Sequence, residues 1–156
     1  MKRLLTFATV VVLTVVGSGL LLAQNNPQIG SWKLNDAKSK VSSGAGKNTA
    51  VVIAAAGDSM KVTVDGIAAD GKPSHNEWMG KFDGKEYPIT GDPVSDTRAY
   101  KPVNDHTLSL TEKKAGKITN TGRVVVSADG RTRTVTVNGT DANGKKTNIL
   151  FVYDKK

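Results

Sequence analysis

Short segments in which polar and apolar residues alternate recur through residues 30–156, and small polar turns separate them. The clearest segments are residues 61–64, 107–111 and 134–137. Alternation with a period of two places every second side chain on the same face of a β-strand, so one face packs inward and the other meets solvent. No segment after residue 23 shows a convincing helical period. The pattern therefore predicts an all-β chain.

Turn signals divide this part of the chain at intervals of 10 to 14 residues. Asp-Gly and Asn-Gly tolerate the positive φ of type I′ hairpin turns. They occur, each followed by a basic residue, at Asp70-Gly71-Lys72, Asp83-Gly84-Lys85, Asp129-Gly130-Arg131 and Asn143-Gly144-Lys145. We expect ten strands, starting near residues 30, 48, 59, 74, 85, 97, 106, 117, 131 and 146. The polar segment before the second strand is expected to form a loop or at most one short turn.

Ten consecutive antiparallel strands exceed what a single flat sheet usually carries, and closure of the sheet removes its exposed edges. We therefore predict an antiparallel up-and-down β-barrel of about 8–10 strands. A sandwich of two sheets is the alternative.

The N-terminal 23 residues differ from the rest. Lys2-Arg3 precedes an uncharged apolar run at residues 4–23, which is the pattern of a secretory signal peptide with cleavage expected after Ala23. An uncleaved anchor is the alternative, because about 20 apolar residues can span a bilayer. We expect a signal peptide at 1–23, a short linker at 24–29 and one barrel domain at 30–156. This predicts an exported protein, periplasmic or secreted, with no stable membrane span after cleavage.

Composition narrows the possible functions. The 156 residues include no cysteine, two histidines, 22 Lys and Arg and 14 Asp and Glu, for a net charge of +8. Without cysteine there is no disulfide framework, cysteine-bound metal or thiol nucleophile. The basic residues are spread along the chain instead of forming a patch interleaved with aromatic residues. We expect no specific nucleic-acid partner and only weak attraction to anionic envelope surfaces.

Motifs at both ends of the barrel domain resemble those of the calycin superfamily. Gly30-Ser31-Trp32-Lys33-Leu34 looks like the G-x-W signature, and it is close to the G-T-W-K-L of fatty-acid-binding proteins. Val152-Tyr153-Asp154-Lys155 resembles the V-Y-E-K with which those proteins commonly finish. The opening motif and the D-G-K turns are also similar to small exported bacterial proteins called lipocalin-like.

The resemblance implies a calycin-type barrel in which Gly30 and Trp32 are the structural signature. Trp32 would close the floor of the barrel with its indole buried and its N–H paired. Lipocalins stack a late basic residue over this tryptophan, and Lys155, Arg131 and Arg133 are the candidates for that role.

Two departures limit what the resemblance implies. Fatty-acid-binding proteins place a helix-turn-helix lid after the first strand, and residues 35–47 are too short and too rich in Gly and Ser to form it. Those that grip a carboxylate often carry Arg two residues before the tyrosine of the last strand. Tyr153 matches that tyrosine, but Phe151 occupies the arginine position. Recognition of a ligand carboxylate is therefore not carried over.

The strand expected near residue 74 has the most varied chemistry. His75 and Glu77 lie on one face and Trp78 on the other. With Trp78 inward, the interior gains an aromatic wall or a core tryptophan; with the opposite face inward, it gains an imidazole beside a carboxylate. His75, Glu77 and His106 form a conceivable zinc set. Because His106 lies in a hairpin turn where solvation is the default, we expect no metal and no cofactor.

Arginines on two strands bear on the nature of any ligand. Arg98 shares a strand face with Tyr100, and Arg131 shares one with Arg133. An inward arginine is costly unless it is paired, so it would imply a buried acid or an anionic ligand. We expect Arg98 and Arg131 to point outward.

No motif places a nucleophilic serine on a strained turn, and most aspartates lie in turns, so we expect no enzyme. The predicted function is an exported protein that binds or carries a small hydrophobic or amphipathic ligand. Its candidate ligand-binding residues are Trp78, Tyr100, Phe151, Tyr153, His75 and Glu77. The alternative is a protein-interaction or inhibitor barrel acting through loops 35–47 and 91–96. A packed interior would favour that alternative, and an open, lined cavity would favour the ligand-binding function.

Overall fold

The structure is a computed structural model that describes residues 26–140 and 144–156. The predicted signal peptide at 1–23 and its cleavage site lie outside the described residues. Apart from one 3₁₀ turn, η1 (Asp36–Lys38), the regular structure consists of strands. They are β1 (Gly30–Leu34), β2 (Lys47–Ala56), β3 (Ser59–Ile67), β4 (Pro73–Gly80), β5 (Tyr87–Thr90), β6 (Thr97–Asn104), β7 (Thr107–Lys114), β8 (Lys117–Val126), β9 (Thr132–Thr140) and β10 (Lys146–Lys155).

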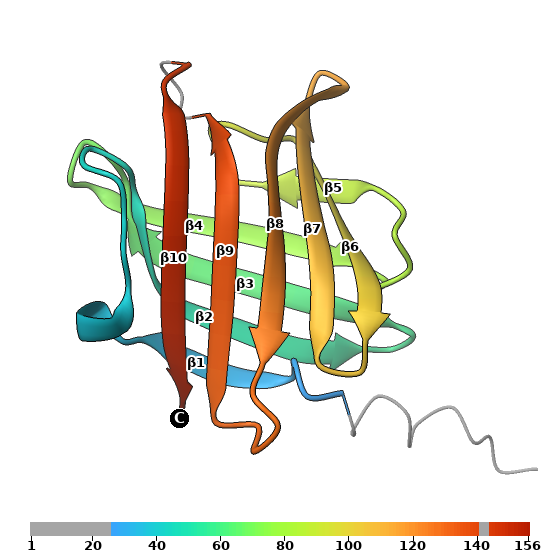
Figure 1. The fold of residues 1–156 in the computed structure, drawn as a ribbon. Coiled ribbons are helices and arrows are strands. Elements are labelled where there is room, and N and C mark those ends of the chain that lie inside the picture. The colour runs from blue at the N-terminus through green and yellow to red at the C-terminus, as the bar shows by residue number, and fades with distance from the viewer. Residues whose placement is uncertain (1–25, 141–143) are drawn as a thin grey trace, which may run out of the picture.

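The ten strands form one closed barrel in which each strand pairs antiparallel with its neighbours in the chain. The barrel closes between the first and last strands, where Trp32 is the register partner of Lys155. In Figure 1, β7–β10 cross in front of β1–β4. The prediction of an all-β up-and-down barrel is confirmed, and closure excludes the two-sheet sandwich. β5 has the shortest pairing of the ten strands, with two register pairs to β4 and two to β6.

One end of the barrel, which we call the closed end, carries the chain segment before β1 and the turns that follow β2, β4, β6 and β8. Trp32 is 1% exposed there, and its Nε1 donates a hydrogen bond to the Gln28 backbone carbonyl at 3.0 Å. The Lys155 ammonium lies 5.1 Å from the centre of the indole. The indole is thus buried with its N–H paired, as expected, and Lys155 is the basic residue stacked on it. Gln28, expected in a linker, is buried at this end.

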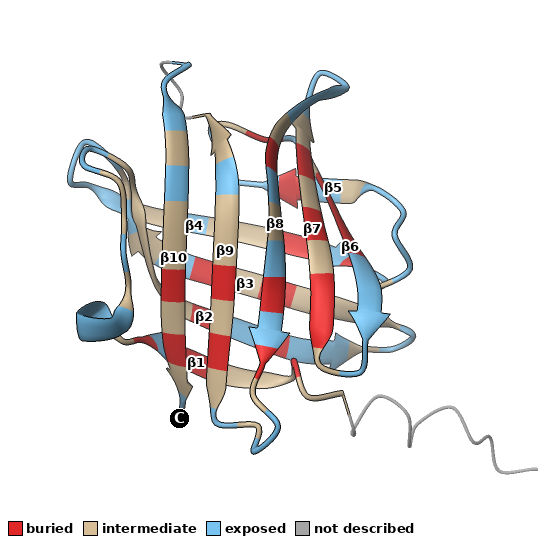
Figure 2. Cartoon of the chain, viewed as in Figure 1, coloured by how far each residue is buried: buried red, intermediate tan, exposed pale blue. Residues whose placement is uncertain are grey.

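Buried positions alternate with intermediate or exposed ones along much of the strands, as the burial colours in Figure 2 show. An aromatic cluster fills the barrel between β4 and β6, where the Trp78 ring contacts those of Phe82, Tyr87 and Tyr100 at centroid distances of 5.0 to 6.0 Å. Gly80 makes room for it, because a Cβ there would lie 2.4 Å from the Tyr87 ring. Among the described residues, no helix has the length and apolar character needed to cross a bilayer.

Candidate ligand-binding cavity

The barrel interior is only partly filled and contains a cavity of about 270 Å³. Its wall is mainly aliphatic, formed by inward residues such as Val62, Val64 and Leu110. Four charged side chains also line it: Asp92, Arg98, Glu112 and Arg133. The cavity extends to the end of the barrel opposite the closed end, which we call the open end. There the β3–β4 turn and the β5–β6 loop line it, the latter through Pro93 and Val94. A mainly aliphatic chamber that also contains charged side chains, reached from the open end, is therefore available to a small molecule.

Three of the residues predicted to bind a ligand line this cavity: Tyr100, Phe151 and Tyr153. Trp78 also faces inward, but it is held in the aromatic cluster, where its Nε1 donates to the Arg98 backbone carbonyl at 2.9 Å. Trp78 does not line the cavity. Of the two orientations considered for β4, the structure therefore has the one in which Trp78 faces inward as a core residue.

His75 and Glu77 lie on the outer face of β4, so they point away from the cavity. His75 Nδ1 lies 2.7 Å from an Asp65 carboxylate oxygen, and this hydrogen bond raises the pKa of His75. Glu77 pairs with Lys61 at 2.7 Å, which lowers the pKa of Glu77. These contacts form a solvated network of ion pairs on the surface. Within residues 26–140 and 144–156, no three potential ligands among His, Asp and Glu are arranged to hold a metal ion.

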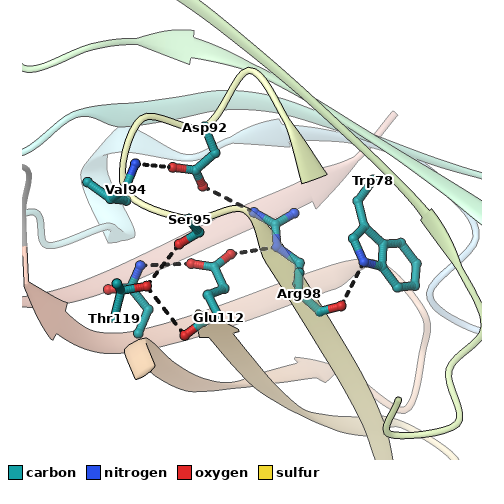
Figure 3. Close-up of polar contacts among 8 residues, drawn as sticks. Trp78, Asp92, Val94, Ser95, Arg98, Glu112 and Thr119 are labelled. Atoms are coloured by element: carbon teal, nitrogen blue, oxygen red, sulfur yellow. Dashed lines mark hydrogen bonds and ion pairs between the residues drawn. The ribbon is translucent and has the colours of Figure 1, made fainter. Parts of the chain in front are cut away.

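Arg98 points into the barrel, so the expectation that it faces outward was wrong. Its side chain is 8% exposed, and its Nε donates to a Glu112 carboxylate oxygen at 2.5 Å. The other Glu112 oxygen accepts from Asn120 Nδ2 at 2.7 Å. Burial opposes the positive charge of Arg98, but Glu112 raises the pKa of the guanidinium above its ordinary value. Figure 3 shows this network, in which a buried acid accounts for the buried arginine.

Two residues of the β5–β6 loop, Asp92 and Ser95, join the loop to the residues around Arg98. Asp92 lies 3.8 Å from Arg98 Nη2 and accepts a hydrogen bond from the Val94 backbone N–H at 2.8 Å. Burial raises the pKa of the Asp92 carboxyl, and the Glu112 charge raises it further. Ser95 and Thr119 share a hydroxyl hydrogen bond of 2.9 Å that ties the loop to β8 (Figure 3).

Arg133 is the second buried arginine, and its surroundings differ from those of Arg98. It is 4% exposed, lines the cavity and lies near the closed end, opposite Tyr153 in the β9–β10 register. Its Nε donates to Gln28 Oε1 at 3.4 Å, and its guanidinium lies 5.8 Å from the centre of the Tyr153 ring. No carboxylate of the described residues forms an ion pair with it. Burial lowers the pKa of Arg133, and burial also raises the pKa of the Tyr153 hydroxyl.

Sequence reasoning missed Glu112, Asn120, Asp92 and Gln28. Glu112 could have been found, because it continues the alternation of Leu108 and Leu110 on the inward face of β7. The others occupy a loop, the segment before β1 and a polar stretch of β8, where no local pattern marks a buried position.

Comparison with known proteins identifies no family. No protein-family model matches the sequence, and no curated protein matches it. Among solved structures, a redesigned β-barrel, mFAP1, bound to DFHBI aligns with a TM-score of 0.47 and 14% sequence identity. The alignment covers 85% of this chain and 97% of that chain. This likeness concerns the fold alone, and membership of the calycin superfamily stays a prediction.

Proposed function

We propose that this barrel binds a small amphipathic molecule with a negatively charged group, and that the charged group lies against Arg133. One observation carries the proposal: in a mainly aliphatic cavity, the lining carboxylates Glu112 and Asp92 pair with Arg98, and no described carboxylate pairs with the buried Arg133. Removing a guanidinium from water costs several kcal/mol unless an opposite charge and hydrogen bonds compensate it. A ligand anion would supply both, and charge-assisted hydrogen bonds to arginine are among the strongest available.

The dimensions of the cavity support a small ligand. A volume of about 270 Å³ corresponds to roughly nine water molecules at ~30 Å³ each, which is space for about ten non-hydrogen atoms. The charged group would lie deep in the barrel, because Arg133 follows the first residue of β9 at the closed end. A longer apolar tail would leave through the open end past Pro93 and Val94, which line the cavity there.

The interaction-barrel alternative predicts a packed interior, so the cavity favours ligand binding. The apolar run at residues 4–23 supports a periplasmic or secreted location for this binding. The net positive charge supports an additional weak association with anionic envelope surfaces.

The test compares ligands that differ in charge and share a tail. Octanoate, octyl sulfate and octanol are titrated calorimetrically into the wild type, Arg133→Met and Arg131→Met. We expect the two anions to bind the wild type about tenfold or more tightly than octanol, since a hydrogen bond to a charged group contributes about 1.5–3 kcal/mol. Arg133→Met should remove this preference and keep octanol binding. Arg131, exposed at the β8–β9 turn, is the matched control and should leave the preference intact. Equal affinities for octanol and the anions in the wild type, or no binding of any of the three, would overturn the proposal.

A further inference from the structure

Gln28 precedes the first strand, yet its side chain is built into the end of the barrel. It is 2% exposed, although most side chains of its type are on the surface. Its Nε2 donates to the His106 backbone carbonyl at 3.3 Å, and its own backbone carbonyl accepts from Trp32 Nε1 at 3.0 Å. Its backbone N–H donates to Asn26 Oδ1 at 3.0 Å. The residue is therefore fixed from both its side chain and its backbone.

The remaining polar atom of this side chain, Gln28 Oε1, accepts a hydrogen bond from Arg133 Nε at 3.4 Å. The two residues lie 105 positions apart in the sequence. A guanidinium has five N–H donors in a fixed plane. Gln28 engages the one on Nε, and no described residue accepts a hydrogen bond from the Nη atoms of Arg133. The amide thus fixes one edge of the guanidinium and leaves the other edge for another acceptor.

The chemistry of the amide matters as much as its position. A glutamine side chain has nearly the same shape as a glutamate side chain, but it carries no charge. At Arg98 the protein places a carboxylate against Nε, and the charge is neutralised internally. At Arg133 it places a neutral oxygen against the same atom, so the charge is held in place without being neutralised.

From this contrast, we propose that Gln28 is a positioning residue that orients Arg133 and keeps its charge available to a ligand anion. The inference rests on the proposed function and assigns part of the anion site to the segment before β1. On this inference, the amide at residue 28 makes the site select an anionic ligand, and a carboxylate there would remove that selectivity.

The test is the nearly isosteric substitution Gln28→Glu, which supplies an internal counter-charge. Octanoate, octyl sulfate and octanol are titrated into this variant and into Asn26→Asp. We expect Gln28→Glu to lower the affinity for both anions at least tenfold and to change that for octanol less than twofold. Asn26→Asp adds the same charge to the same segment, and its carboxylate can still accept from the Gln28 backbone N–H. It should leave the ratio of anion to octanol affinity within twofold of the wild type.

A purely structural role for Gln28 would lower the affinities for the anions and octanol together, and that result would overturn the inference. The inference also fails if Gln28→Glu leaves the ratio of anion to octanol affinity unchanged while Arg133→Met removes the preference for anions. The proposed function stands in that case. If Arg133→Met also leaves the ratio unchanged, the proposed function fails as well. Should Gln28→Glu not fold, Gln28→Met takes its place, and we expect the ratio to fall at least threefold because Arg133 loses its anchor.

Discussion

Replacing Arg133 with methionine is expected to stabilise the ligand-free barrel, whereas the same replacement at Arg98 is expected to destabilise it. Both side chains are buried, but they leave different groups behind. Arg98 is paired with Glu112 at 2.5 Å, so its removal strands a buried carboxylate. Arg133 has an amide oxygen at 3.4 Å and an aromatic ring as its neighbours, so its removal strands no charge.

The expected magnitudes follow from these contacts. At Arg133, methionine removes a desolvation cost of several kcal/mol. It also leaves the buried Gln28 Oε1 without its donor, at a cost of about 1 kcal/mol, and loses a cation–π contact of about 1 kcal/mol. The net gain is about 2 kcal/mol, or a rise of roughly 6 °C in Tm for a domain of this size. At Arg98, breaking a buried ion pair from one side costs about 3–5 kcal/mol.

The assay is urea unfolding of ligand-free protein, followed by the fluorescence of the two buried tryptophans and extrapolated to water. Arg131→Met is the control, because an exposed arginine in a turn should change the unfolding free energy by less than about 0.5 kcal/mol. A loss of several kcal/mol for Arg133→Met, similar to that for Arg98→Met, would refute the reasoning. It would mean that the protein itself compensates the charge of Arg133.

Two further predictions concern the rest of the barrel. Trp78→Phe should lower the free energy of unfolding, measured in urea, by about 2 kcal/mol. The change leaves the buried Arg98 carbonyl of β6 without its donor and opens space among the aromatic rings. An unchanged urea midpoint would contradict this packing. NMR titration should find the pKa of His75 above its ordinary value of about 6.5 and lower in Asp65→Asn. Since the folded-state pKa is the higher one, this contact stabilises the fold below about pH 6.5 and loses its effect as pH rises through that pKa. Asp65→Asn should reduce this dependence without removing it, because Glu77 lies 3.7 Å from His75 Nε2 and also raises the His75 pKa.

The strands and the barrel could be predicted because their signals are local. Turn dipeptides and period-two alternation lie within a few residues of each other, and β1, β3, β6, β8 and β10 begin at the expected residues. β5 begins two residues later than expected, because residues 81–86 form a connection whose Gly84 N–H donates to the Tyr100 carbonyl of β6. That contact joins segments that no local pattern relates.

The orientation of the arginines could not be predicted in the same way. Alternation shows which residues share a face, and Arg98 does share one with Tyr100, but it does not show which face is inside. For Arg98 the answer depends on Glu112, which lies on the next strand directly opposite. For Arg133 it depends on Gln28, which lies 105 positions away in the sequence, so no local window contains the contact.

The pairing of β1 with β10 has a consequence for how the chain acquires this structure. Trp32 and Lys155 are register partners although almost the whole barrel domain separates them in the sequence. The entropy of closing so long a loop must be overcome before this pairing contributes, so folding is expected to be slow compared with that of a helical domain of similar size. Until β10 arrives, every shorter intermediate exposes two unpaired strand edges, which are sites for association with other chains. Loss of a few C-terminal residues would therefore remove hydrogen-bonding partners from both β1 and β9.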